Sequence, residues 1–182
     1  MSQGATSSPA LTDAAVIDAA AWRALVLNTL AFTVCFAVWM MNGVLMTYLV
    51  DNGIQDWDPA SLGWLIGVPV LTGSIMRLPI GLLTDRFGGK WVFGLLLLGS
   101  AVPTYLVGSC DNFTEFFLAS LGFWMTGTGF AVGIAFTSVW FPPQRQGLAL
   151  GIFGAGNAGS AVTSLAGPLL LKYCLLYTSR CV

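Results

Sequence analysis

Charge is scarce in this chain, since Asp, Glu, Lys and Arg make up only 8% of its 182 residues. A typical soluble domain carries about 25% charged residues. So few charged side chains cannot cover a globular surface that faces water. Because hydrophobic residues make up 56% of the sequence, we expect lipid to be the solvent for most of the chain.

Histidine is absent, and the formal net charge is −1. The first absence removes the commonest metal ligand and general base, and the second leaves no basic surface for nucleic acid. The sequence offers no nucleophile–base pair and no nucleotide-binding loop, and the positions of the four cysteines indicate no disulfide framework. We therefore expect no enzyme activity, no metal, no cofactor and no nucleic-acid partner.

Long apolar runs are the dominant feature of the sequence. A membrane-spanning helix needs roughly 20 mostly apolar residues, and backbone inside a bilayer must satisfy its own hydrogen bonds. These rules predict an all-α membrane protein with five transmembrane helices. The predicted helices span residues 24–50, 61–84, 91–109, 114–140 and 148–172.

The two ends of the chain differ from this pattern. Residues 1–22 are small and polar, and we expect a disordered cytoplasmic tail there. Residues 174–182 resemble the translation of an adapter used in DNA sequencing libraries, so we expect them not to belong to the natural protein. The expected transporter bundle is therefore 23–173.

The charges in the connections predict the orientation in the membrane. Basic residues favour the cytoplasmic side. They flank the first span and occupy the second and fourth connections, whereas the first and third connections contain acidic residues and no Lys or Arg. We therefore expect the N-terminus to be cytoplasmic, although Lys172 after the fifth span opposes the rule.

Arg77 is a cation inside the second apolar run, eight residues before Asp85. That spacing places it roughly 12 Å from the cytoplasmic end of the helix, and helical side chains lean toward the helix N-terminus, which here is toward the midplane. No Asp or Glu lies in the interior of any predicted span. A guanidinium there is suited to a planar oxyanion, although snorkelling to the surface is an alternative.

The second connection carries a spaced pattern of glycine and charge. Its residues are Gly81, Asp85, Arg86, Gly88 and Lys90. This pattern resembles the G-x-L-x-D-R-x-G-x-[RK] signature of the major facilitator superfamily, between the same two helices. The resemblance implies that the five helices are most of the N-terminal six-helix half of a two-half transporter. Asp85 and Arg86 would contact neighbouring helix ends in one conformation of that transporter.

The fifth span is rich in glycine and contains one amide, Asn157. Its run from Phe141 through Gly151, Gly154, Gly156 and Gly159 resembles the nitrate signature of the nitrate/nitrite porter family, with a tighter spacing around Gly154 than in some members.

This resemblance implies that Arg77 binds the anion, that Phe130 stacks on it and that Asn157 is the signature asparagine. Phe130 lies eleven residues before Phe141, and Asn157 lies ten residues after Gly147. These spacings predict the same layer as the Arg77 guanidinium.

Other interpretations of these residues remain open. Phe130 could face lipid or pack between helices, and Asn157 could be an interhelical hydrogen-bond pin. Asn42, in the first span, could line the cavity or serve packing.

The whole pattern predicts a multi-pass inner-membrane transporter of nitrate or nitrite that needs a second, C-terminal half as partner. The lack of an intramembrane carboxylate or histidine favours nitrate/nitrite exchange over proton symport. Alternatives are a transporter of small organic anions and a non-transporting sensor or assembly module. We expect this chain alone not to transport, which nitrate uptake into proteoliposomes would test.

Overall fold

The computed structural model describes the backbone of residues 18–178 and the side chains of residues 18–173. The described chain is helical apart from its short connections, so the all-α fold is confirmed. Five stretches are long and apolar enough to cross a membrane. The helices in chain order are α1 (Ala19–Asp51), α2 (Pro59–Phe87), α3 (Gly89–Val107), α4 (Phe113–Gly122), α5 (Trp124–Trp140), α6 (Pro143–Gly154), the 3₁₀-helix η1 (Ala155–Asn157) and α7 (Ala158–Thr178).

The first helix begins earlier than predicted. The Asp18 carboxylate accepts a hydrogen bond from the Ala20 backbone N–H at 3.3 Å, which satisfies one of the free donors of the first turn. Ala21 is already buried. The predicted tail is therefore wrong for residues 19–22, while residues 1–17 lie outside the described part of the chain.

The last helix runs past the predicted boundary at residue 174. The backbone of α7 continues to Thr178, and residues 179–182 lie outside the described part of the chain. The interpretation of 174–182 as an adapter stays a prediction.

The fourth span is broken where it was predicted to be one helix. The break lies at Phe123, whose backbone N–H donates to the carbonyl of Ser120, three residues back. Beside it, a Cβ added to Gly122 would lie 2.6 Å from Pro103 of α3. Close packing at this glycine and the 3₁₀-type bond together divide the span into α4 and α5.

The fifth span starts five residues before its predicted start and is also interrupted. Pro143 occupies the first turn of α6, a position that suits proline because no N–H is needed there. The polar residues that follow it had indicated a loop. Farther along, three residues from Ala155 to Asn157 form a 3₁₀ turn between α6 and α7.

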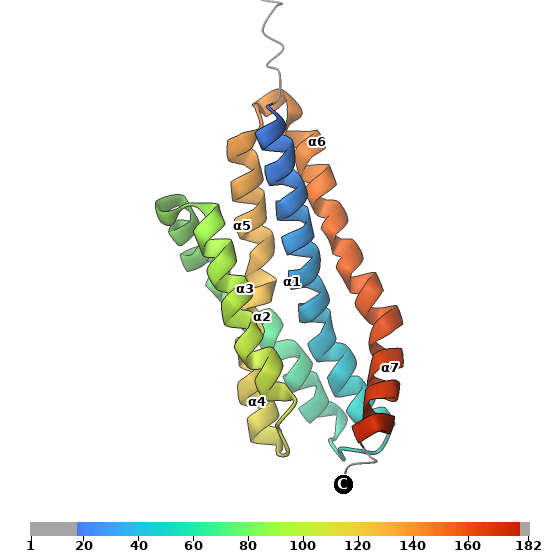
Figure 1. The fold of residues 1–182 in the computed structure, drawn as a ribbon. Helices are drawn as coiled ribbons and strands as arrows, with labels where there is room; N and C mark the ends of the chain where they lie inside the picture. The colour runs from blue at the N-terminus through green and yellow to red at the C-terminus, as the bar shows by residue number, and fades with distance from the viewer. Residues whose placement is uncertain (1–17, 179–182) are drawn as a thin grey trace, which may run out of the picture.

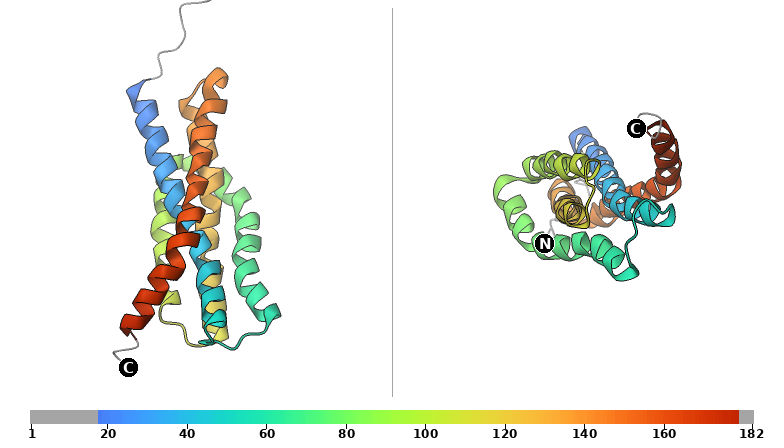
Figure 2. Two further views of the ribbon diagram at one scale, coloured as in Figure 1. Left: turned by 90° about the vertical axis from the view of Figure 1, so that its right-hand side faces the viewer. Right: turned by 90° about the horizontal axis from the view of Figure 1, so that it is seen from below.

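Helices α1 and α5 lie at the centre of the described bundle. Helix α1 packs mainly against α7 and α5, and α5 also packs against α2 and α3. Figure 1 shows α1 between α5 and α7, with α3 in front of the lower part of α5, and the view from below in Figure 2 shows α5 enclosed by its neighbours. Two clusters of buried side chains fill the bundle, one around Phe32 and Phe153 and one around Met46 and Phe116.

The outer surface is apolar. Leu78, Tyr105 and Val139 are 78%, 80% and 84% exposed. Large apolar groups exposed this widely are typical of a surface that meets lipid or another protein. The structure therefore agrees with the composition in assigning a bilayer as the surroundings.

Candidate functional site

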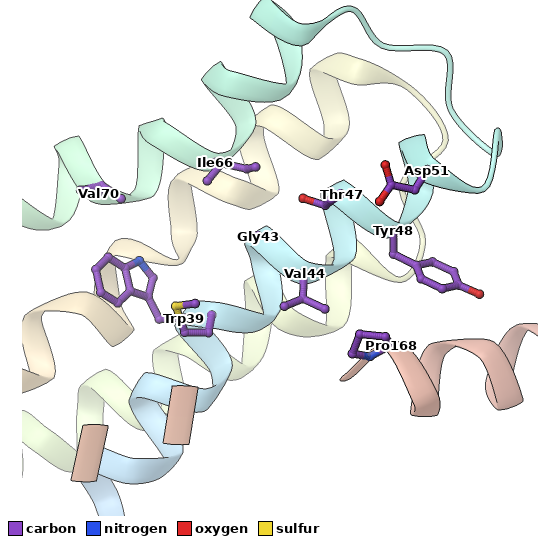
Figure 3. A pocket seen from close by; sticks show the side chains of 10 residues that line it. Trp39, Gly43, Val44, Thr47, Tyr48, Asp51, Ile66, Val70 and Pro168 are labelled. Atoms are coloured by element: carbon purple, nitrogen blue, oxygen red, sulfur yellow. The ribbon is translucent and has the colours of Figure 1, made fainter. Parts of the chain in front are cut away.

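An open groove of about 500 Å³ lies along α1, between α2 and α7. Figure 3 shows the side chains that line it. The lining residues are Trp39, Met40, Gly43, Val44, Thr47, Tyr48, Asp51, Ile66, Val70 and Pro168. Polar groups gather at one end of the groove and Trp39 lies toward the other, as Figure 3 shows.

Arg77 lies on α2 beyond Ile66 and Val70, the two α2 residues that line this groove, and is not itself a lining residue. It follows Val70 by seven residues, which is two helical turns, so the two side chains project on nearly the same side. Because helical side chains generally point toward the N-terminus of their helix, this geometry favours an Arg77 side chain that extends in the direction of the groove. The Arg77 side chain is exposed in the described chain.

The level of Arg77 along the bundle follows from a contact between α2 and α5. A Cβ added to Gly73 would lie 3.6 Å from the carbonyl oxygen of Trp124, so the two helices pass each other there. Both helices run toward the end of the bundle where α1 begins, as Figure 1 shows. Arg77 lies four residues beyond this crossing and Phe130 six, about 6 and 9 Å along the axis, so they share a layer.

Phe130 lies at the junction of α5, α1 and α6. Its ring centroid is 5.5 Å from that of Phe32 and 6.1 Å from that of Phe153. The ring is nevertheless 37% exposed. It therefore presents part of its surface outside the packed core, where an aromatic face or edge can meet a ligand.

Asn157 lies at the same level on the neighbouring span. A Cβ added to Gly133 would collide with the Phe153 ring, so α6 crosses α5 at this pair. The two spans run in opposite directions, and Asn157 is four residues after Phe153. It therefore lies level with Gly129 and Phe130. Its side chain is exposed, and its backbone carbonyl accepts a hydrogen bond from Ser160 Oγ at 2.7 Å.

Asn42 differs from these three residues because it is buried and fully engaged. Its Nδ2 donates to the carbonyl of Leu65 at 3.1 Å, and its Oδ1 accepts from Ser120 Oγ at 3.1 Å. Only 2% of the residue is exposed. These contacts join α1 to α2 and α4, so the structure favours the packing role over a place in the cavity.

The four signature glycines divide into two pairs. A Cβ added to Gly156 would lie 2.6 Å from the Phe32 ring, and one added to Gly159 would collide with the Thr33 carbonyl. Gly151 and Gly154 would gain no neighbour within 4 Å. Gly156 and Gly159 therefore let α1 approach η1 and the start of α7 closely. Gly151 and Gly154 lie on a face of α6 that no other described helix contacts.

The charged connection between α2 and α3 needs glycine for two different reasons. Gly88 has φ +84°, a conformation that residues with a side chain rarely adopt. A Cβ added to Gly89 would lie 2.7 Å from Phe136 on α5. Asp85, Arg86 and Lys90 are exposed, and the Arg86 guanidinium lies 5.7 Å from the Phe87 ring centroid. The predicted contacts of Asp85 and Arg86 with neighbouring helix ends stay a prediction.

Sequence reasoning gave no role to several residues that organise the site. Phe32 and Phe153 form a buried stack, Trp39 lies beside Gly127, and Asn28 donates from α1 to α5 at Thr137 Oγ1 over 2.7 Å. The spacing of Phe32, Phe36 and Trp39 on one face of α1 was the available signal.

Among the described residues there is no group of three or more Asp, Glu, Cys or His that could hold a metal ion.

Comparison with known families matches the Major Facilitator Superfamily over residues 20–175. This chain belongs to that superfamily. As a member of the Major Facilitator Superfamily with five membrane-crossing helices, it is a multi-pass membrane protein.

Curated relatives of this superfamily member carry transporter names. The "Probable nitrate/nitrite antiporter NarK1" of Thermus thermophilus is 45% identical over 150 residues, which are 82% of this chain and 33% of that protein. The "Probable nitrate/nitrite transporter NarK2" of Mycobacterium tuberculosis is 35% identical over 162 residues, 87% of this chain and 40% of that protein. The "Probable nitrate transporter NarT" of Staphylococcus epidermidis is 32% identical over 146 residues, 80% of this chain and 37% of that protein. The chain thus spans about a third to two fifths of the length of these relatives.

Proposed function

We propose that this chain is the first, anion-binding part of a nitrate/nitrite transporter. The observation that carries the proposal is the common layer of Arg77, Phe130 and Asn157, all with accessible side chains on three different spans. The names of the relatives from Thermus and Mycobacterium support the same substrate class. A site near the middle of the bundle is where transporters of this architecture bind substrate.

Each of the three residues contributes a different interaction. The Arg77 guanidinium offers parallel N–H donors to two oxygens of a planar anion. The exposed part of the Phe130 ring offers a flat apolar surface to the face of the same anion. The Asn157 amide supplies an uncharged N–H donor to an oxygen that Arg77 leaves free.

The absence of a nearby carboxylate gives this site its preference for anions. In the described helices the acidic residues lie at helix ends, at Asp51, Asp85 and Glu115. The positive charge of Arg77 is therefore left for a substrate, because a cation in an apolar layer is unfavourable without a counter-charge.

Transport requires the remainder of a longer protein. We infer that a C-terminal half closes the site from the other side and that the two halves rock about the anion. In this arrangement the N-terminus lies in the cytoplasm and the protein spans the inner membrane. Without an intramembrane carboxylate or histidine in this part, exchange of nitrate for nitrite is favoured over proton symport.

The test is nitrate uptake by the full-length protein carrying Arg77→Lys, reconstituted in proteoliposomes. Lysine keeps the charge but loses the paired donors, so we expect the KM for nitrate to rise roughly ten- to a hundredfold. Arg23→Lys, at the exposed start of α1, is the matched control and should leave KM unchanged.

Competition by formate or oxalate distinguishes the two anion classes. Nitrate and nitrite should compete with labelled nitrate, whereas formate and oxalate should not. Stronger competition by the carboxylates would assign the site to small organic anions. An unchanged KM in Arg77→Lys would contradict the proposed role of Arg77, and saturable binding without any uptake would favour a sensor.

A further inference from the structure

We propose that Phe32 and Phe153 form a positioning pair that holds Phe130 in its anion-binding orientation. The proposal rests on the proposed function, because it concerns the aromatic residue of that site. Neither residue of the pair touches the anion in this scheme, since Phe32 is 0% and Phe153 1% exposed. Both act through their contact with the Phe130 ring.

The two buried rings stack on each other. Their centroids are 4.6 Å apart, with an interplanar angle of 30°. The Phe130 ring packs against both: its centroid is 5.5 Å from that of Phe32 and 6.1 Å from that of Phe153. Offset aromatic pairs at such distances prefer particular relative orientations, so the buried stack restricts the rotation of the half-exposed ring.

Two glycines make room for this stack. A Cβ on Gly133 would collide with the Phe153 ring, and a Cβ on Gly156 would lie 2.6 Å from Phe32 Cδ1. Each glycine faces the ring of one partner on a neighbouring helix, at the junction where Phe130 also lies. The stack therefore needs these two positions to lack a side chain, and it joins α1, α5 and α6 beside Phe130.

The arrangement also connects Phe130 to Asn157. Gly156 contacts Phe32 and directly precedes Asn157. A displacement of the stack would thus move both the aromatic group and the amide of the site. Arg77, on α2, is outside this set of contacts, so its interaction with the anion should survive such a displacement.

The experiment is a double-mutant cycle between Phe153→Leu and Phe130→Leu in the full-length protein, with nitrate KM and kcat measured in proteoliposomes. We expect Phe153→Leu to raise the KM for nitrate roughly three- to tenfold with a much smaller change in kcat. In the Phe130→Leu background the same substitution should have no further effect on KM, because the ring that it positions is gone.

The control is Phe116→Leu, which removes a ring of similar burial (4% exposed) from the other core cluster. It should lower thermal stability and leave KM unchanged. If Phe153→Leu does not yield folded protein, Gly133→Ala keeps every ring, displaces Phe153 and should raise KM in the same way.

Three results would overturn the positioning role: an unchanged KM in both Phe153→Leu and Gly133→Ala, equal effects of Phe153→Leu with and without Phe130, or an equal rise in KM in Phe116→Leu. If Phe130→Leu alone leaves nitrate KM unchanged, the anion site itself is wrong, which is a different outcome from a failure of the pair.

Discussion

At the scale of single residues, the polar side chains of the membrane-spanning helices fall into two groups, one buried and one exposed. Asn28 and Asn42 are buried, and their amide groups bond to neighbouring helices. Arg77 and Asn157 are exposed on spans that are otherwise apolar. Because an unpaired polar group is unfavourable in lipid, the exposed pair is open to a partner outside the described chain, and the anion proposed above is one such partner.

Substitution of Asn42 distinguishes these roles. Asn42→Ala removes the donor to Leu65 and leaves Ser120 Oγ without its acceptor. We expect a loss of about 0.6–2 kcal/mol in the free energy of unfolding and no change in nitrate KM, measured by thermal unfolding and uptake. Asn52→Ala is the control, because the Asn52 amide is exposed and bonds within its own helix. A raised KM for nitrate in Asn42→Ala would contradict the packing role and show that Asn42 lines the substrate cavity.

At the scale of the element, the glycines of the fifth span differ in whether they contact another helix. Gly156 and Gly159 bring the start of α7 against α1, whereas Gly151 and Gly154 on α6 are followed by the 3₁₀ turn and have open space. Small residues allow helix backbones in membranes to approach closely. Gly156 and Gly159 are therefore packed inside the described bundle. Gly151 and Gly154 remain open to contact with a surface outside it.

This division predicts opposite effects for two matched substitutions in the chain of 182 residues. Gly159→Ala places a methyl group against the Thr33 carbonyl, so we expect a loss of about 1–3 kcal/mol in stability. The methyl group added by Gly151→Ala has no neighbouring atom of the described chain within 4 Å. This substitution should therefore be neutral or stabilise the helix by up to about 1 kcal/mol. Thermal unfolding in detergent, followed by circular dichroism, measures both. Equal destabilisation by the two variants would show that α7 does not pack on α1 in this register.

The connections define two ends at the scale of the whole molecule. One end carries Arg23, Lys90 and Arg145, and the other carries Asp51 and Asp111. Basic residues are retained on the cytoplasmic side of membrane proteins. This charge asymmetry supports the proposed topology, in which the start of α1 faces the cytoplasm.

Cysteine labelling in whole cells tests this orientation. In a full-length protein without other cysteines, Asp56→Cys should react with a membrane-impermeant maleimide added from outside. Gln144→Cys, at the start of α6, should react only after the cells are opened. Both positions are exposed, so accessibility is matched. The reverse labelling pattern would invert the proposed topology.

The sequence by itself determined the number of spans, their helical nature and the position of the connection that contains Gly88. These features depend on local composition, because a run of roughly 20 apolar residues can satisfy its backbone in lipid only as a helix. It also indicated Arg77, since a lone cation in such a run is conspicuous without any knowledge of its neighbours.

Only the tertiary structure decided which faces of these helices meet one another. In a membrane, lipid and protein core are equally apolar, so a span has no polar stripe that reveals its packed side. Three features arise from contacts between distant segments: the hydrogen bonds of Asn42, the close approach of Gly122 to Pro103 beside the break at Phe123, and the stack of Phe32 on Phe153. Hydropathy along the chain cannot encode such contacts, because it measures transfer into oil and not the shape of the neighbour.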